Sequence, residues 1–274
     1  MADSVPDARG ARESVIDNFL NSGFSGFAPW ILLSVLSGPG RFEIAVAGAL
    51  VLALLILVLG KWRGKPLHAL EIVGVVYFAA LAVIGLFAPD NTIRWLDDWA
   101  GVLSNVVLAV FVVLTMVVRR PFTLSYAKAE APPEVWDEPW FLRLNLVITA
   151  VWGAAFATAA VAGVVGGLLL HDLDNMFTAW VVPLAALFLA IAFTEVYPER
   201  VVARGTGETA PPTAKIFEWL PGFVLVIGIV GWIADAFPDA VGITLIAIGA
   251  VGGALMSRIL PSEPNDAETA GGPG

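Results

Sequence analysis

The stretch LNLVITAVWGAAFATAAVAGVVGGLLL, residues 144–170, contains 27 consecutive residues without a charged side chain. An α-helix rises 1.5 Å per residue, so about 20 apolar residues are enough to cross the roughly 30 Å of hydrocarbon in a bilayer. This stretch therefore predicts a transmembrane helix, with length to spare for tilt.

The whole chain has the same character as this stretch. Of its 274 residues, 58% belong to the apolar set and 14% are charged, and the mean hydropathy is +0.82. In soluble domains about a quarter of the residues are charged, so this composition excludes a soluble domain. We predict an all-α, polytopic integral membrane helix bundle with seven full spans. The predicted spans are 42–60, 68–88, 99–118, 144–169, 176–196, 218–236 and 239–257.

Segments outside these spans complete the predicted organisation. Phe27–Leu36 is apolar but only 10 residues long and is followed by Gly38-Pro39-Gly40, so we expect a re-entrant or interfacial half-helix. Residues 1–26 form a polar N-terminal segment, residues 27–260 the transmembrane bundle, and residues 261–274 a disordered tail. The last two spans, separated by acids and Pro238, predict a tight transmembrane hairpin.

Cations alternate between successive loops and predict an orientation. Ten Lys and Arg residues lie in loops 61–67, 119–143 and 197–217, whereas the three intervening loops hold only Arg94. Because short loops rich in Lys and Arg stay in the cytoplasm, we expect the ten-cation loops and the C-terminal tail to be cytoplasmic. The expected location is the inner (plasma) membrane, crossed several times.

Composition and motifs narrow the function. The absence of cysteine excludes disulfides and thiolate metal sites, and a net charge of −9 argues against a nucleic-acid partner. The chain has no His-Glu-x-x-His, no Gly-x-Ser-x-Gly and no phosphate-binding glycine loop. We therefore expect a non-enzymatic protein without a cofactor, whose certain partner is the lipid bilayer.

Four polar residues within the spans are candidate functional groups: His68, Glu71, Asn105 and Asn145. His68 and Glu71, three residues apart, are expected on one helical face, where they could relay a proton. A metal needs further ligands, and His171 belongs to the opposite surface, so no metal site is expected. Asn105, well inside its span, is expected to bond to a neighbouring helix more than to a substrate.

Small residues at four-residue spacing predict close helix packing. One ridge lies in the fourth span and the other, Gly249 and Gly253, lies in the seventh. Residues of the first ridge are Ala155, Ala159, Gly163 and Gly167. Contacts within the chain are the favoured use of both ridges, while the oligomeric state stays open.

The loop 119–143 is unusually aromatic for a connection. Its candidate contact residues are Arg119, Arg120, Phe122, Tyr126, Trp136 and Trp140. We expect the aromatic side chains to lie on the inner leaflet with both arginines on anionic headgroups. The sharper alternative is that the loop docks a cytoplasmic or membrane partner.

Several short patterns in this half of the chain occur in a recognisable order. They are Phe27-Ala28-Pro29, Asp90-Asn91-Thr92-Ile93-Arg94-Trp95, Arg119-Arg120-Pro121-Phe122, Pro133-Glu134-Val135-Trp136, Leu144-Asn145-Leu146 and Trp152-Gly153-Ala154-Ala155-Phe156. Over about residues 20–165 the chain resembles the intracellular septation protein A family of bacterial inner-membrane proteins. The resemblance implies a five-span protein of cell-envelope maintenance and septation, with no established enzymatic reaction. This chain adds helices after the fourth span.

Two functions follow as hypotheses. The first is a non-enzymatic envelope protein, acting in septation or envelope maintenance by binding envelope or division membrane proteins. The alternative is a small-solute transporter or channel, suggested by the number of spans, by breaks such as Pro183 and Pro221, and by Asn105 inside a helix. A continuous polar cavity through Asn105 and Asn145 would favour the transporter.

Overall fold

The computed structural model describes residues 23–38, 40–236 and 238–260. Within these ranges the regular structure is entirely helical, and seven helices are long and apolar enough to cross a membrane. Their bounds are Phe42–Trp62, Ala69–Phe87, Asp90–Val117, Pro139–Leu169, Phe177–Thr206, Thr213–Ile233 and Asp239–Ile259. The chain is a polytopic membrane protein, and the predicted fold class is confirmed. The expected tail 261–274 and most of the polar segment 1–26 lie outside the described residues.

Some helices extend beyond the predicted spans, because their ends contain charged residues that lower the local hydropathy. The third helix begins at Asp90, nine residues before the predicted start, because Pro89 caps it in an extended conformation. Its first turns carry charged residues, which a helix tolerates where it emerges from hydrocarbon. Hydropathy detects the apolar part of a helix and not its full length.

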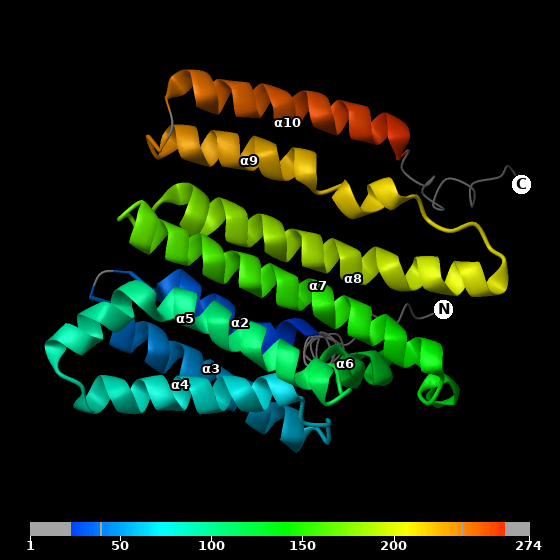
Figure 1. The fold of residues 1–274 in the computed structure, drawn as a ribbon, viewed down its shortest axis with the longest axis horizontal. Coiled ribbons are helices and arrows are strands. Elements are labelled where there is room, and N and C mark those ends of the chain that lie inside the picture. Colours follow the sequence, from blue (N-terminus) through cyan, green and yellow to red (C-terminus); the bar gives the residue numbers. More distant parts are fainter. Residues whose placement is uncertain (1–22, 39, 237, 261–274) are drawn as a thin grey trace, which may run out of the picture. The chain divides into compact units, whose positions relative to one another are not determined.

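The chain divides into two compact units, Met1–Leu173 and Asp174–Gly274. Unit 1 contains a short N-terminal helix, three long helices, a small helical segment and a fourth long helix (Figure 1). These are α2 (Gly23–Leu36), α3 (Phe42–Trp62), α4 (Ala69–Phe87), α5 (Asp90–Val117), α6 (Thr123–Glu130), η1 (Pro133–Val135), α7 (Pro139–Val164) and the π-helical turn η2 (Val165–Leu169).

One face of helix α2 is buried in unit 1, where it packs against α3, α4 and α5, while Ile31 and Val35 on the other face are exposed (Figure 1). Its side chains Phe27, Trp30 and Leu33 are 7%, 4% and 1% exposed. Gly26 lies against Leu70 at the start of α4, whereas Gly40, just after α2, donates a hydrogen bond to the Asp97 carboxylate in α5. The helix is thus short, as predicted, but it is a core element that connects both ends of unit 1.

The small-residue ridge of α7 packs against α5 in the same unit. A Cβ atom on Gly163 would lie 2.5 Å from Val102 of α5, and one on Gly167, in the π-helical turn that continues α7, would lie 2.7 Å from Trp99 of α5. Only residues without a side chain permit such a close approach of two helices. The predicted use of this ridge within the chain is confirmed.

Unit 2 ends in the predicted hairpin. It contains η3 (Phe177–Val181), α8 (Val182–Thr206), η4 (Thr213–Phe217), α9 (Leu220–Ile233) and α10 (Asp239–Ile259). Helices α9 and α10 pack against each other through glycine: a Cβ atom on Gly249 would lie 2.5 Å from the backbone nitrogen of Leu225. The ridge of the seventh span therefore also serves packing within the chain.

Candidate functional site

The candidate site forms where the loop after α5 folds back onto unit 1. Helix α5 ends with Arg119 in the left-handed conformation, at a φ of 54°. The backbone N–H of Arg120 then bonds to the carbonyl of Thr115 at 2.9 Å, and that of Arg119 to the carbonyl of Met116 at 2.9 Å. This Schellman turn satisfies the last carbonyls of the helix and redirects the chain, so that α6 enters the packed end of the unit.

Phe122, directly before α6, joins an aromatic cluster in the core. It is 4% exposed, and its ring centroid lies 6.1 Å from that of Phe27 and 5.9 Å from that of Phe111. Phe27 in turn stacks on Trp152 with centroids 4.6 Å apart. Phe122 was expected on the lipid surface, but it is buried against Phe27 of α2 and Phe111 of α5.

Thr123 fastens α6 to α7. Its hydroxyl donates to the backbone carbonyl of Asn145 at 3.1 Å and lies 2.8 Å from the hydroxyl of Thr149. The Asn145 side chain is 1% exposed, and its amide donates to the carbonyl of Phe141 one turn earlier in its own helix, at 2.9 Å. Asn145 is therefore a packed residue of α7 beneath α6.

Ser125 and Tyr126 fasten α6 to the start of α4 through His68. The His68 ring is 2% exposed, stacks on the Tyr126 ring with centroids 4.0 Å apart, and places Nδ1 3.0 Å from the Ser125 hydroxyl oxygen. Ser125 donates its own proton to the carbonyl of Phe122 at 3.0 Å, so His68 must be the donor in the contact, with its proton on Nδ1. Burial lowers the pKa of His68, which favours this neutral form.

His68 and Glu71 form a helix cap instead of a pair on one helical face. His68 precedes α4 in an extended conformation, with φ of −90° and ψ of 142°. Its backbone N–H donates to the Glu71 carboxylate at 3.4 Å, as in a capping box. Spacing alone could not reveal this, because the helix begins between the two residues. Within the described ranges, no group of three or more His, Asp or Glu side chains could hold a metal ion.

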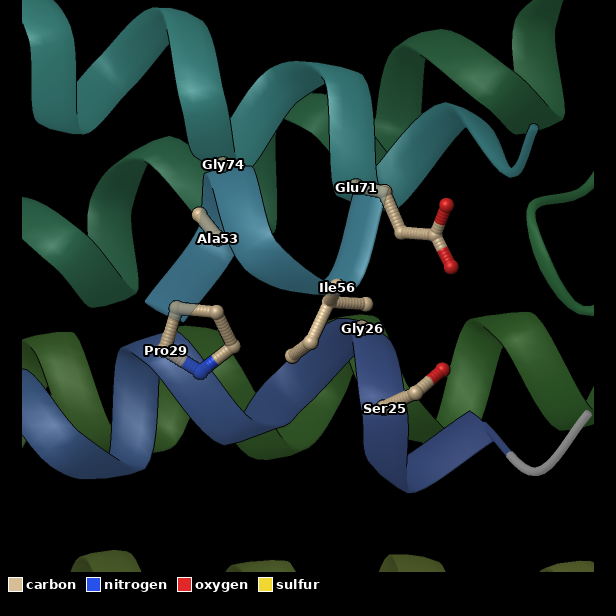
Figure 2. Close-up of a pocket in the computed structure, with 7 residues that line it drawn as sticks. All are labelled: Ser25, Gly26, Pro29, Ala53, Ile56, Glu71 and Gly74. Carbon is tan, nitrogen blue, oxygen red and sulfur yellow. The ribbon is translucent and has the colours of Figure 1, made fainter. Parts of the chain in front are cut away.

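The Tyr126 hydroxyl lies against Gly26, which is one of the residues that line a small cavity between α2, α3 and α4. The Tyr126 side chain is 8% exposed, and its hydroxyl has no hydrogen-bond partner among the described residues. Burial raises the pKa of Tyr126, and the nearby charge of Glu71 raises it further. The cavity has room for about one water molecule. Its lining residues are Ser25, Gly26, Pro29, Ala53, Ile56, Glu71 and Gly74 (Figure 2).

The remaining loop candidates lie on the outside of unit 1. Arg119 and Arg120 are exposed, and Trp140 is 37% exposed. Trp136 is half-buried: its indole N–H donates to the carbonyl of Ala131 at 3.0 Å, and the Lys128 ammonium lies 5.2 Å from its ring centre. Of the four aromatics expected on lipid, two are thus in the core and two remain outside.

Asn105 stands apart from this site. Its half-buried side chain donates to the carbonyl of Gly101, one turn earlier in α5, at 3.0 Å. This differs from the expected partner on a neighbouring helix. A helix backbone can itself satisfy a side-chain amide one turn later, as Asn145 also illustrates.

Sequence reasoning missed the small residues that build the site. Thr123 and Ser125 carry its hydrogen bonds, and Gly26 lets the Tyr126 hydroxyl approach α2. The available signal was a pair of hydroxyl residues between the aromatic residues Phe122 and Tyr126, but hydroxyl residues are common in loops. We call Phe122, Thr123, Ser125 and Tyr126 the α6 anchor.

No protein-family model, curated protein or solved structure matches this chain.

Proposed function

We propose that the chain is a non-enzymatic membrane protein of the cell envelope that binds other envelope or division proteins through the outer surface of residues 119–143. The observation that carries this proposal is the α6 anchor. Side chains of the anchor contact α2, α4, α5 and α7, so the segment is held on the bundle as a folded element. A held segment presents its outer side chains in fixed positions, which lowers the entropic cost of binding a partner.

The side chains available for such binding are Arg119, Arg120 and Trp140, all exposed. Arginine and tryptophan are the residue types that most often dominate the energy of protein interfaces. The acids Glu134, Asp137 and Glu138 are also exposed on this segment, so its surface carries both signs of charge. A surface with both signs of charge complements a protein partner better than it complements a partner that is uniformly anionic.

The orientation belongs to the same proposal. Loops 61–67, 119–143 and 197–217 and the C-terminal tail are cytoplasmic, and the membrane is the inner (plasma) membrane. The ten-to-one distribution of cations between alternate loops supports this assignment. The resemblance to septation protein A over residues 20–165 supports a role in septation or envelope maintenance. The alternative of a solute transporter gains nothing from Asn105 and Asn145, since each bonds to its own helix.

In-cell photocrosslinking tests the proposal. A photoreactive residue replaces Arg120 or Trp140 in one set of strains, and exposed Glu208, in another loop assigned to the cytoplasm, serves as the control. We expect crosslinks from 120 and 140 to an envelope or division protein that position 208 does not capture. With the photoreactive residue at position 140, the double variant Arg119→Glu/Arg120→Glu should lose that product while its abundance in the membrane stays normal. Identical products from all three positions, or lipid products alone, would rule out a specific partner surface.

A further inference from the structure

The segment 61–67 between α3 and α4, which we call the basic turn, contains cations but no acid. Its charged side chains are Lys61, Arg63 and Lys65. No Asp or Glu occurs between Glu43 and Glu71, whereas the other two loops rich in cations, 119–143 and 197–217, contain acids as well. Glu71 is half-buried, and its carboxylate accepts a hydrogen bond from the backbone of the residue before α4. The basic turn itself therefore contributes only positive charge.

Backbone hydrogen bonds hold the basic turn in a defined conformation. The N–H of Lys65 donates to the carbonyl of Gly60 at 2.9 Å, and that of Gly64 donates to the carbonyl of Lys61 at 3.1 Å. Gly64 has a φ of 71°, which a residue with a Cβ atom rarely adopts. These bonds close α3 as in a Schellman motif, so the side chains of the turn project from a fixed backbone.

Two apolar side chains are exposed beside the cations of the basic turn. Trp62, the last residue of α3, is 83% exposed, and Leu67 is 45% exposed. Lys61 is exposed too, whereas Arg63 and Lys65 are half-buried and have interactions within the chain. Lys61, Trp62 and Leu67 are thus the side chains most open to a ligand.

The length of α3 places the basic turn at the membrane surface. The 21 residues of this helix rise about 30 Å at 1.5 Å per residue, which matches the thickness of the hydrocarbon core. Trp62 then lies at the level of the lipid headgroups, where tryptophan is enriched. From the same level, the Lys61 ammonium can reach a phosphate while its methylene groups lie along apolar surface.

The chemistry of the basic turn selects an anionic phospholipid. A phosphate complements cations that have no acid among them, and acyl chains complement the exposed Trp62 and Leu67. The ammonium of a zwitterionic lipid would be repelled by the same cations. The position of Trp62 at the membrane surface favours a lipid over an acidic peptide. We propose that the basic turn is a binding site for one anionic phospholipid, whose phosphate contacts Lys61 and whose acyl chains contact Trp62 and Leu67. This site depends on neither the proposed function nor the assigned orientation.

Photocrosslinking to lipids tests the site in the full chain. The chain is reconstituted in phosphatidylcholine that contains a small share of either photoreactive phosphatidylglycerol or photoreactive phosphatidylcholine, and mass spectrometry locates the labelled residues. Phosphatidylglycerol should label residues 61–67 about fivefold more than phosphatidylcholine, because one cation near an anionic surface corresponds to about that factor in affinity. Equal labelling by the two lipids would overturn the proposal. So would the same preference at loop 197–217, which also has three cations but has acids among them.

Two variants separate this site from a general attraction between charges. Lys61→Gln should reduce the preference for phosphatidylglycerol at residues 61–67 about fivefold. The matched control Arg204→Gln removes another exposed cation and should leave that preference unchanged. A preference that survives Lys61→Gln, or that falls equally in both variants, would contradict a lipid held by Lys61.

Soluble competitors identify the ligand. Glycerol phosphate in excess should leave the labelling of residues 61–67 unchanged, because it has no acyl chains to contact Trp62 and Leu67. An acidic peptide should also fail to compete. Loss of the labelling with glycerol phosphate would show a site for the free headgroup, and loss with the peptide would show a site for acidic protein segments. Either loss would overturn the assignment to a phospholipid.

Discussion

Arg119 occupies a backbone conformation that usually belongs to glycine. Its φ of 54° places it in the left-handed region at the end of α5, where the two backbone bonds of Arg120 and Arg119 close the helix. This conformation costs roughly 1–2 kcal/mol for a residue with a Cβ atom. The side chain is exposed, so nothing in the packing of unit 1 requires arginine here.

We therefore expect Arg119→Gly to leave the free energy of unfolding unchanged or to raise it by up to about 1 kcal/mol, since relief of strain opposes the greater freedom of glycine in the unfolded chain. Thermal unfolding in detergent measures the effect. Arg120→Gly is the matched control, because Arg120 has no positive φ and gains no such relief. A loss of more than about 1 kcal/mol at position 119 alone would mean that the arginine side chain itself stabilises the fold.

His68 makes stability depend on pH. Burial lowers its pKa in the folded state, so the unfolded chain binds the proton more readily. The stability that the neutral His68 ring contributes should be fully present above a pH of about 6.5, the ordinary pKa of histidine, and should be lost as the pH drops below that value. Stability falls at low pH because the unfolded chain binds a proton at His68 more readily than the folded protein, in which the neutral ring is buried.

His68→Asn provides the test, because its amide can replace Nδ1 as the donor to Ser125 but cannot be protonated. The unfolding midpoint of the parent should decrease between pH 6.5 and 5 more steeply than that of the variant. Parallel curves for the two proteins would show that His68 does not cause the acid sensitivity.

At the level of helices, the sequence predicted where the helices lie along the chain better than it predicted which side chains are buried. Hydrophobic runs located all seven long helices because hydrocarbon requires them. Phe122 and Tyr126 were expected on the lipid surface, but both side chains are buried in the core. In a membrane protein, lipid and protein interior are similarly apolar, so an aromatic face does not indicate which of them it contacts.

The α9–α10 hairpin offers a test of helix contact. A Cβ atom on Gly249 would lie 2.5 Å from backbone of Leu225, so Gly249→Ala must push the two helices apart. We expect a loss of roughly 1–3 kcal/mol in the free energy of unfolding, measured in bilayers or mild detergent. Gly253→Ala is the control in the same helix, because its Cβ atom would only reach ordinary contact with Pro221, at 4.0 Å. Equal effects of the two variants would argue against the packing of this hairpin.

At the level of the whole molecule, α2 adds a connection between both ends of unit 1. It starts beside Leu70 and Tyr126 and ends next to the start of α3. The sequence could locate α2 but not its neighbours, because contacts such as that between Phe27 and Trp152 join residues far apart in the chain.

This arrangement predicts that a tag placed ahead of Gly23 lies on the same side of the membrane as residue 130. Reporter fusions at 130 and at the N-terminal end should both be active in the cytoplasm, and a fusion at 172 should be active outside it. If the N-terminal reporter and the reporter at 172 behave alike, α2 does not pass from one side to the other.

The burial of α2 also has a consequence for synthesis. Phe27 reaches its stacking partner Trp152 only after about 125 more residues have left the ribosome, which takes roughly 6 to 25 s at ~5–20 residues per second. Throughout that interval the Phe27 end of this 14-residue, proline-containing helix lacks Trp152 and Phe156, whereas Trp30 can already stack on Tyr77 of α4. The packing of α2 is therefore completed only when α7 has been made, and a ribosome pause before residue 152 would lengthen the time during which Phe27 lacks that packing.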